Sequence, residues 1–371
     1  MDRRDFLKAA AFTTAGAMMG PTVLQRAGSM LASPALAAPG GTLFGFSAQE
    51  YEGQSREQLI TYLEDLGGVP LDTVHNRFPW QTSLVNKYSK WIVQTGRTPI
   101  LSWFTRGTGG VSWRPIAEGV HDARIRHEAQ SIAAAGWPAY FCFHKEPEDE
   151  PSLGTASDWR AAHDRVYELF QQEGATNVTF VACLMASTFK GSAGGSAAWL
   201  PPRYDVLGVD GYNRNVGGNW RSFETIFRPS LQVARDRSKP LYVIELGCVE
   251  GASGRKGDWM RDAAATTASW PELIGVSYNH EAGQTGKDAD MNYRVDTSAA
   301  AIQGFRDMVH HAAFAGESGG GTGGGDTGDG DASCEVPRRK LRNRREQVRE
   351  LQAKLERQRR KTRRLRERLN G

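Results

Sequence analysis

The chain has 371 residues, with 46 Lys or Arg against 42 Asp or Glu, so its formal net charge is +4. Its share of charged residues, 24%, is ordinary for a soluble protein. No apolar run reaches the roughly 18 residues of a membrane-spanning helix, which excludes an integral membrane protein. Four cysteines in a chain of this length exclude a disulfide-built scaffold.

The charge is unevenly distributed along the chain. Residues 335–371 contain 16 basic and 5 acidic side chains, a net charge of +11, so the other 334 residues sum to −7. An acidic body is therefore joined to a strongly basic tail, and the two need separate interpretations.

The first 37 residues have the pattern of a twin-arginine signal peptide. Arg3-Arg4 is followed by Phe6-Leu7-Lys8, then by a weakly apolar run over residues 9–20 and by the small residues Ala35-Leu36-Ala37. An amphipathic helix with a chance arginine pair is the alternative, but it does not explain this order of features. We expect export of the folded protein by the twin-arginine route, to a secreted or cell-envelope location.

Residues 40–315 alternate between short apolar segments and amphipathic ones. The apolar segments predict eight strands, at residues 42–47, 73–78, 99–105, 139–144, 178–185, 206–210, 241–246 and 273–278. Helices are expected between them, clearest at 55–66, 83–95, 118–135 and 156–173, with a last one at 298–313. The strands are continuously apolar, as in a parallel sheet covered on both faces. Eight such units predict an α/β fold, the (β/α)8 or TIM barrel.

A doubly wound sheet is the competing fold, but the Gly-rich phosphate turn expected after its first strand is missing. The chain has no GxGxxG, P-loop or CxxC motif, and no His and Cys cluster at metal-ligand spacing. We therefore expect no metal and no cofactor. Cys142 and Cys183 fall inside neighbouring predicted strands, and the sequence leaves both buried free thiols and a disulfide open.

Polar and aromatic residues gather where the predicted strands end, which is where a barrel of this kind places its chemistry. Aromatic rings stack on the apolar faces of sugars, and carboxylates and amides bond their hydroxyl groups. The pattern thus predicts a carbohydrate cleft. Its candidate substrate-binding residues are Trp103, His144, Asp210, Tyr212, Asn213, Tyr278 and Asn279.

Two carboxylates follow buried apolar runs, Glu146 after the fourth predicted strand and Glu245 in the seventh. A buried carboxylate is costly unless it is paired or lies at a mouth, so either residue alone could be a salt-bridged structural acid. Together, on strands four and seven, they fit the division of labour in glycoside hydrolysis, with one acid protonated and the other ionised.

These segments resemble glycoside hydrolase family 26, the β-mannanase group of (β/α)8 retaining enzymes. The resemblance covers about residues 42–310 and rests on segments 143–148, 205–213, 239–247, 274–279 and 293–296. It implies Glu146 as acid/base and Glu245 as nucleophile, with Tyr212 near the nucleophile and Asp210 and Asn213 beside it. It also implies an endo-β-mannanase-like hydrolase that cuts β-1,4-linked polysaccharide by double displacement.

The chain departs from this family at two positions. Lys145 precedes the acid/base where His is usual, and Tyr293 replaces a more usual Trp. An ammonium beside Glu146 stabilises its ionised form, which does not suit a general acid. Since neighbours in a strand face opposite sides, we expect Lys145 to point away from the site. A weak or inactive carbohydrate-binding barrel, or an envelope-anchoring protein, remain the alternatives.

The C-terminal region consists of a Gly-rich linker over residues 316–334 and a basic segment over 335–371. The linker composition predicts a flexible tether. In the basic segment an apolar position recurs every seven residues, at Leu341, Val348, Leu355, Thr362 and Leu369, which predicts a coiled-coil helix. Like charges would face each other in a homodimer, so we expect this tail to bind an anionic envelope polymer or an acidic partner helix.

Overall fold

Eight parallel strands close into a barrel in the computed structural model, which describes residues 41–51, 53–282 and 291–314. The strands pair in chain order, and β8 closes on β1 with Gly45 opposite Ser277. They are β1 (Leu43–Ser47), β2 (Thr73–Pro79), β3 (Thr98–Phe104), β4 (Ala139–Phe143), β5 (Val178–Met185), β6 (Val206–Asn213), β7 (Leu241–Cys248) and β8 (Leu273–Asn279). The predicted (β/α)8 fold is confirmed.

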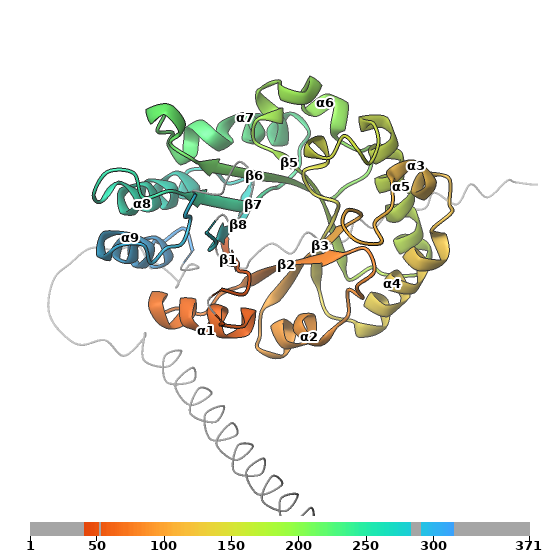
Figure 1. Ribbon diagram of the computed structural model, residues 1–371, viewed down its shortest axis with the longest axis horizontal. Helices are drawn as coiled ribbons and strands as arrows, with labels where there is room; N and C mark the ends of the chain where they lie inside the picture. Colours follow the sequence, from red (N-terminus) through yellow and green to blue (C-terminus); the bar gives the residue numbers. More distant parts are fainter. Residues whose placement is uncertain (1–40, 52, 283–290, 315–371) are drawn as a thin grey trace, which may run out of the picture. The chain divides into compact units, whose positions relative to one another are not determined.

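Helices surround the strands on the outside of the barrel (Figure 1). They are α1 (Arg56–Gly67), α2 (Lys87–Gln94), α3 (Trp113–Ala117), α4 (Asp122–Ala135), α5 (Ala156–Gln172), α6 (Ser196–Trp199), α7 (Phe223–Asp236), α8 (Arg255–Ala268) and α9 (Ala299–Val309). Short 3-10 turns η1 (Pro147–Asp149), η2 (Thr188–Lys190), η3 (Ser192–Gly194) and η4 (Val216–Gly218) lie in the loops after β4, β5 and β6. No helix within these described ranges is both long and apolar enough to cross a membrane.

Capping residues explain where the helices begin. The Asn86 side chain accepts the backbone N–H groups of Tyr88 and Ser89, so α2 begins later than the apolar pattern predicts. The helix predicted at 118–135 begins later, as α4 at Asp122, because Gly119 adopts a φ of +86° between α3 and α4. Such a positive φ cannot continue a right-handed helix.

Alternate residues of each strand point to different cores. One face of the strands packs against the helices in a large apolar layer that includes Leu101, Phe141 and Val276. The other face fills the barrel interior with a small cluster that includes Ile100, Tyr140 and Tyr242. Side chains on the interior face are the ones that line the mouth of the barrel. Since side chains alternate along a strand, a residue can reach a site at the mouth only if it lies on the interior face.

The predicted signal peptide, linker and coiled-coil tail lie outside the described residues. The boundaries proposed at residues 37, 315 and 334 therefore stay predictions, as does the export route.

Candidate active site

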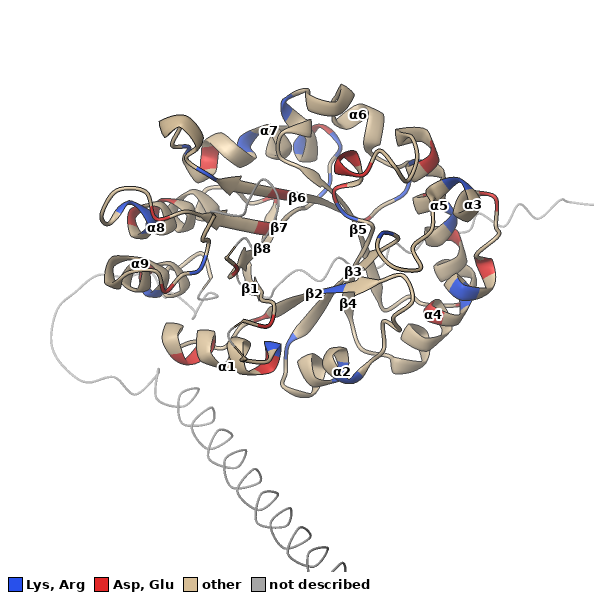
Figure 2. Cartoon of the chain, in the orientation of Figure 1, with Lys and Arg blue, Asp and Glu red and all other residues tan. Residues whose placement is uncertain are grey.

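Charged residues are rare in the strands, and three of them meet at the carboxyl end of the barrel. The charged residues of these strands are Arg77 in β2, Asp210 in β6 and Glu245 in β7. Figure 2 shows a basic position on β2 and acidic positions on β6 and β7. Because all eight strands are parallel, their carboxyl ends open on the same face, where loops can admit a ligand.

A β-bulge brings Glu245 into the barrel. Tyr242 and Ile244 point to the interior, so strict alternation would turn Glu245 outward towards the helices. The pairing of β6 with β7 shifts between Val209 and Asp210, where Asp210 lies opposite Glu245 rather than opposite Ile244. A bulge adds one residue to a strand and re-aims the side chains that follow it. The Glu245 side chain is 4% exposed.

Four side chains surround the Glu245 carboxylate. Arg77 donates to Oε1 from Nη2 at 2.8 Å and from Nε at 3.2 Å, and His75 Nδ1 lies 3.3 Å from the same oxygen. Tyr212 donates its hydroxyl to Oε2 at 2.5 Å, and Lys145 Nζ lies 3.2 Å from that oxygen. The carboxylate is thus held in one orientation by side chains from β2, β6 and the loop after β4.

The charges around Glu245 keep it ionised. Burial alone would raise the pKa of its carboxyl group, but the Arg77 guanidinium and the Lys145 ammonium hold that pKa well below its usual range. Burial lowers the pKa of His75 to about 3, so its ring is neutral, with Nε2 bonded to Ser102 Oγ at 2.8 Å. A neutral ring adds no charge, and the two cations account for the ionised state.

Lys145 points into the site, which corrects the expectation that it points away. His144 has a φ of +44° and Glu146 a φ of +53°, so the chain leaves extended geometry immediately after β4. The alternation of neighbouring side chains no longer applies there, and His144 turns away in place of Lys145. Its Nδ1 accepts the Thr105 backbone N–H at 3.0 Å, within the protein core.

The Lys145 ammonium joins three carboxylates. Its Nζ lies 2.7 Å from Asp210 Oδ2, 3.2 Å from Glu245 Oε2 and 3.3 Å from Glu146 Oε2. Burial would lower the pKa of Lys145, but the three carboxylates raise it well above its usual value. The buried ammonium is therefore charged and fixes the positions of the acids around it.

Glu146 and Glu245 lie close together. Their Oε2 atoms cannot be more than about 6.5 Å apart, the sum of their distances to Lys145 Nζ, which is compatible with the roughly 5–5.5 Å of retaining glycosidases. The Glu146 side chain is 25% exposed, against 4% for Glu245. One acid is thus open to solvent and the other is enclosed and ionised, which suits different chemical roles.

Further hydrogen bonds hold Tyr212 and Arg77, the two side chains that donate to Glu245. Asn279 Nδ2 donates to the Tyr212 hydroxyl at 3.2 Å, and Arg77 Nη2 donates to Asn279 Oδ1 at 3.2 Å. Arg77 also binds Glu281 through Nη1, at 2.9 and 3.1 Å. The predicted residues Tyr212 and Asn279 therefore reach the site, and Asp210 acts on it through Lys145.

Four predicted substrate-binding residues do not face the site. Trp103 and Tyr278 lie two residues after Leu101 and Val276, so they point outward to the helices as those residues do. Both are fully buried in the layer beneath the helices. The Trp103 ring stacks on Trp80, with centroids 4.2 Å apart. Side chains without exposed surface cannot touch a bound sugar, so these assignments are corrected.

His144 and Asn213 are also fully buried. Asn213 Oδ1 accepts the Arg221 backbone N–H at 3.2 Å, which holds the loop after β6 in place. The structure thus gives both residues a role in shaping loops.

Three residues of the site were given no role from the sequence: His75, which was expected near the cleft, Arg77 and Glu281. His75 and Arg77 are two apart in β2, a spacing that places both on the interior face of a strand. Polar residues at that spacing, alternating with the buried Val74 and with Asn76 in the same strand, are the signal that could have found them. Glu281 lies just after β8, and its contact with Arg77 depends on barrel closure.

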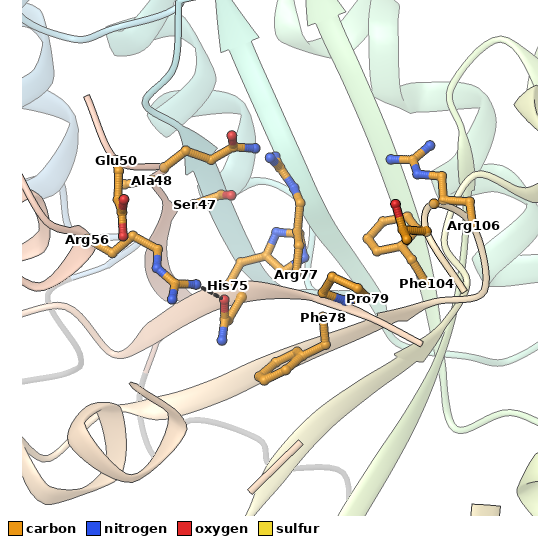
Figure 3. A pocket seen from close by; sticks show the side chains of 14 residues that line it. Ser47, Ala48, Glu50, Arg56, His75, Arg77, Phe78, Pro79, Phe104 and Arg106 are labelled. Atoms are coloured by element: carbon orange, nitrogen blue, oxygen red, sulfur yellow. Dashed lines mark hydrogen bonds between the residues drawn. The ribbon is translucent and has the colours of Figure 1, made fainter. Parts of the chain in front are cut away.

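A pocket of about 650 Å³ adjoins these residues at the ends of β1, β2 and β3. Figure 3 shows Arg77 in its centre and His75 below, and both contact Glu245 on the other side. The pocket is therefore separated from Glu245 by the side chains of His75 and Arg77. No group of three His, Cys, Asp or Glu in the described part of the chain is arranged to hold a metal ion.

Cys142 and Cys183 are both buried free thiols, so the structure contains no disulfide between them. They line the barrel interior below the site. Burial raises the pKa of the Cys142 thiol to about 12, so it does not ionise near neutral pH.

Glu148 provides a test of the loop after β4. Burial raises its pKa to about 7, while Oε1 accepts the Met185 backbone N–H at 2.6 Å and the Thr188 hydroxyl at 2.7 Å. The native state then holds this proton more tightly than the unfolded chain, so stability falls as the pH rises from about 4.5 to about 7. We expect ionisation of Glu148 to lower the unfolding free energy by about 2 kcal/mol between these pH values.

The measurement compares urea unfolding of the wild type and Glu148→Gln at pH 5 and pH 8. The glutamine keeps the acceptor oxygen but cannot ionise, so its loss of stability between the two pH values should be smaller. Equal losses in both proteins would show that Glu148 does not hold a proton in the native state.

Comparison with known structures supports the fold. The chain is similar to the catalytic domain of a GH26 endo-β-1,4-mannanase from Bacillus sp. JAMB-750, with 13% identity over 74% of this chain and 86% of that one, at a TM-score of 0.52. It is also similar to a β-mannanase from a symbiotic protist of the termite Reticulitermes speratus, complexed with gluco-manno-oligosaccharide. Here the identity is 16% over 73% of this chain and 87% of that one, at a TM-score of 0.50.

No protein-family model matches the chain, and no curated protein matches it in sequence. Identities this low show a shared (β/α)8 architecture, and the chemistry has to be argued from the site itself.

Proposed function

We propose that the protein is a retaining glycoside hydrolase in which Glu245 is the nucleophile and Glu146 the acid/base. The observation that supports this most is the meeting of both carboxylates at the Lys145 ammonium, one ionised and enclosed and the other open to solvent. No other arrangement of the described residues at the barrel mouth offers a nucleophile so well oriented.

The proposed reaction has two displacements. Glu245 Oε attacks the anomeric carbon while the glycosidic C–O bond breaks, and Glu146 gives its proton to the leaving oxygen. Water then attacks the same carbon and gives a proton to Glu146, and the bond to Glu245 breaks. Tyr212 and Arg77 orient the Glu245 carboxylate throughout. The anomeric configuration is retained because it is inverted twice.

A β-1,4-linked polysaccharide of the mannan type is the substrate that we propose. Two considerations support it: the family-26-like segments of the sequence and the likeness of the barrel to two structures described as β-mannanases. We propose in addition that the protein acts outside the cytoplasm, since residues 1–37 have the twin-arginine pattern. The basic tail would then hold it to an anionic polymer of the envelope.

The test is reducing-sugar release from a panel of mannans, xylans and glucans by the full chain. We expect hydrolysis of at least one β-1,4-linked glycan, and a loss of about 10²- to 10³-fold in Glu146→Gln. Glu168→Gln is the matched control, because Glu168 pairs with Arg165 on the outer helix α5. No hydrolysis of any glycan in the panel would contradict the proposal.

One observation favours a second candidate, a barrel that binds carbohydrate with little or no catalysis. The Lys145 ammonium lies 3.3 Å from Glu146 Oε2 and 3.2 Å from Glu245 Oε2, at the position where family 26 usually has His. Under this alternative Lys145→His, the residue usual in family 26, raises hydrolysis without changing glycan affinity. A wild type that binds a glycan in the panel without cutting it would favour this candidate.

A further inference from the structure

The pocket beside the carboxylate pair is lined by more cations than anions. Its wall contains three arginines, Arg56, Arg77 and Arg106, against one acid, Glu50, while the fifth ionisable group, His75, is neutral. In Figure 3 Arg56 and Arg106 lie towards opposite ends of the pocket, with Arg77 between them. A neutral polysaccharide has no group that needs this excess of positive charge.

Arg56 occupies a position that helix energetics disfavour. It is the first residue of α1, where the positive end of the helix dipole repels a cation. The guanidinium is nevertheless held in place, because it lies 4.1 Å above the Tyr88 ring and donates from Nη1 to Asn76 Oδ1 at 2.7 Å. A fixed cation at an unfavourable position suggests a role other than stabilising the helix.

The three arginines differ in how far they are already neutralised. Arg77 binds the Glu245 and Glu281 carboxylates, and Arg106 pairs with Glu150, with its own side chain 48% exposed. Arg56 forms no ion pair with any described carboxylate, and it donates to the neutral amide of Asn76. Its remaining N–H groups are available to an incoming acceptor at the pocket wall.

We infer that this pocket binds a uronic acid unit of the glycan, with its carboxylate held by Arg56. The planar fork of a guanidinium matches the two oxygens of a carboxylate, which gives geometry as well as charge. The pocket volume, about 650 Å³, is in the range of small-ligand sites. The inference rests on the proposed function only in taking the ligand to be part of a glycan.

The test is titration calorimetry of the full chain with matched tetrasaccharides. Each β-1,4-linked oligouronate (mannuronate and glucuronate) is compared with its neutral counterpart, mannotetraose or cellotetraose. We expect at least one oligouronate to bind ten times more tightly than its counterpart in 50 mM salt, with a smaller preference in 500 mM salt.

Variants show whether the oligouronate binds in this pocket. They are needed because the basic tail could also bind an anionic sugar. Arg56→Gln should lower oligouronate affinity at least tenfold and change the affinity for the neutral sugar less than twofold. Arg56→Lys should keep part of the affinity, since it retains charge without the fork. Arg228→Gln is the control, because Arg228 lies on α7 with its side chain 64% exposed.

Unchanged oligouronate affinity in Arg56→Gln, or no preference for either oligouronate, would overturn the inference. Equally tight binding of a 6-O-sulfated mannotetraose would overturn the assignment to a carboxylate and indicate a general anion site. Hydrolysis of neutral mannan without any oligouronate preference would leave the proposed function intact and reject only this inference. Oligouronate binding without hydrolysis of any glycan would support this inference and reject the proposed function.

Discussion

Replacing Glu245 with glutamine is expected to lower kcat/KM by about 10³-fold or more and to destabilise the fold by about 3 kcal/mol. The activity falls because an amide cannot act as the nucleophile. The stability falls because the 4%-exposed carboxylate pairs with both Arg77 and Lys145, and each cation loses one of its counter-ions when the side chain becomes neutral. Steady-state kinetics and urea unfolding measure the two effects separately.

Glu146→Gln is the comparison for this variant. The Glu146 side chain is 25% exposed and touches Lys145 through one oxygen, so its loss should change stability by less than about 1 kcal/mol. We therefore expect both variants to lose activity and only Glu245→Gln to lose much stability. Retained hydrolysis in Glu245→Gln would refute its role as nucleophile.

Removing the Lys145 ammonium is expected to cost about 3–5 kcal/mol of unfolding free energy. Lys145→Met keeps most of the length of the side chain and leaves Asp210, Glu146 and Glu245 without the cation that they share. Three carboxylates would then repel one another in a region shielded from water. Urea unfolding at pH 7 measures the loss.

The double variant Lys145→Met/Asp210→Asn supplies the control. Removing both charges of the 2.7 Å pair should be less costly than the sum of the single changes, by about 2 kcal/mol. Additive losses within about 0.5 kcal/mol would show that the pair does not couple, and would leave Lys145 without the anchoring role described above.

The fold was predictable because it depends on features that a sequence displays directly. Eight apolar segments separated by amphipathic ones are sufficient to predict eight strands and a barrel. Their carboxyl ends were predicted less well, since β6 extends to Asn213 and β7 to Cys248. Polar residues such as Tyr212 continue these strands at the mouth because partners across the barrel satisfy their hydrogen bonds.

The site was predictable only in part, because it depends on which way each side chain turns. Alternation would have placed Trp103 and Tyr278 against the helices and His75 and Arg77 inside the barrel. It would also have misplaced Glu245 and Lys145, whose orientation depends on a bulge and on the positive φ of His144. Neither of these local departures from extended geometry has a marker in the sequence.

The catalytic roles of Glu146 and Glu245 can be tested most directly by trapping the covalent intermediate. A 2-deoxy-2-fluoro glycoside with a good leaving group, made from the sugar that the enzyme releases, slows both displacements and lets the glycosyl-enzyme accumulate. Peptide mapping by mass spectrometry then locates the attached sugar. The account predicts a single label on the Glu245 carboxylate. A label on another residue, or hydrolysis that proceeds with inversion and without any label, would contradict it.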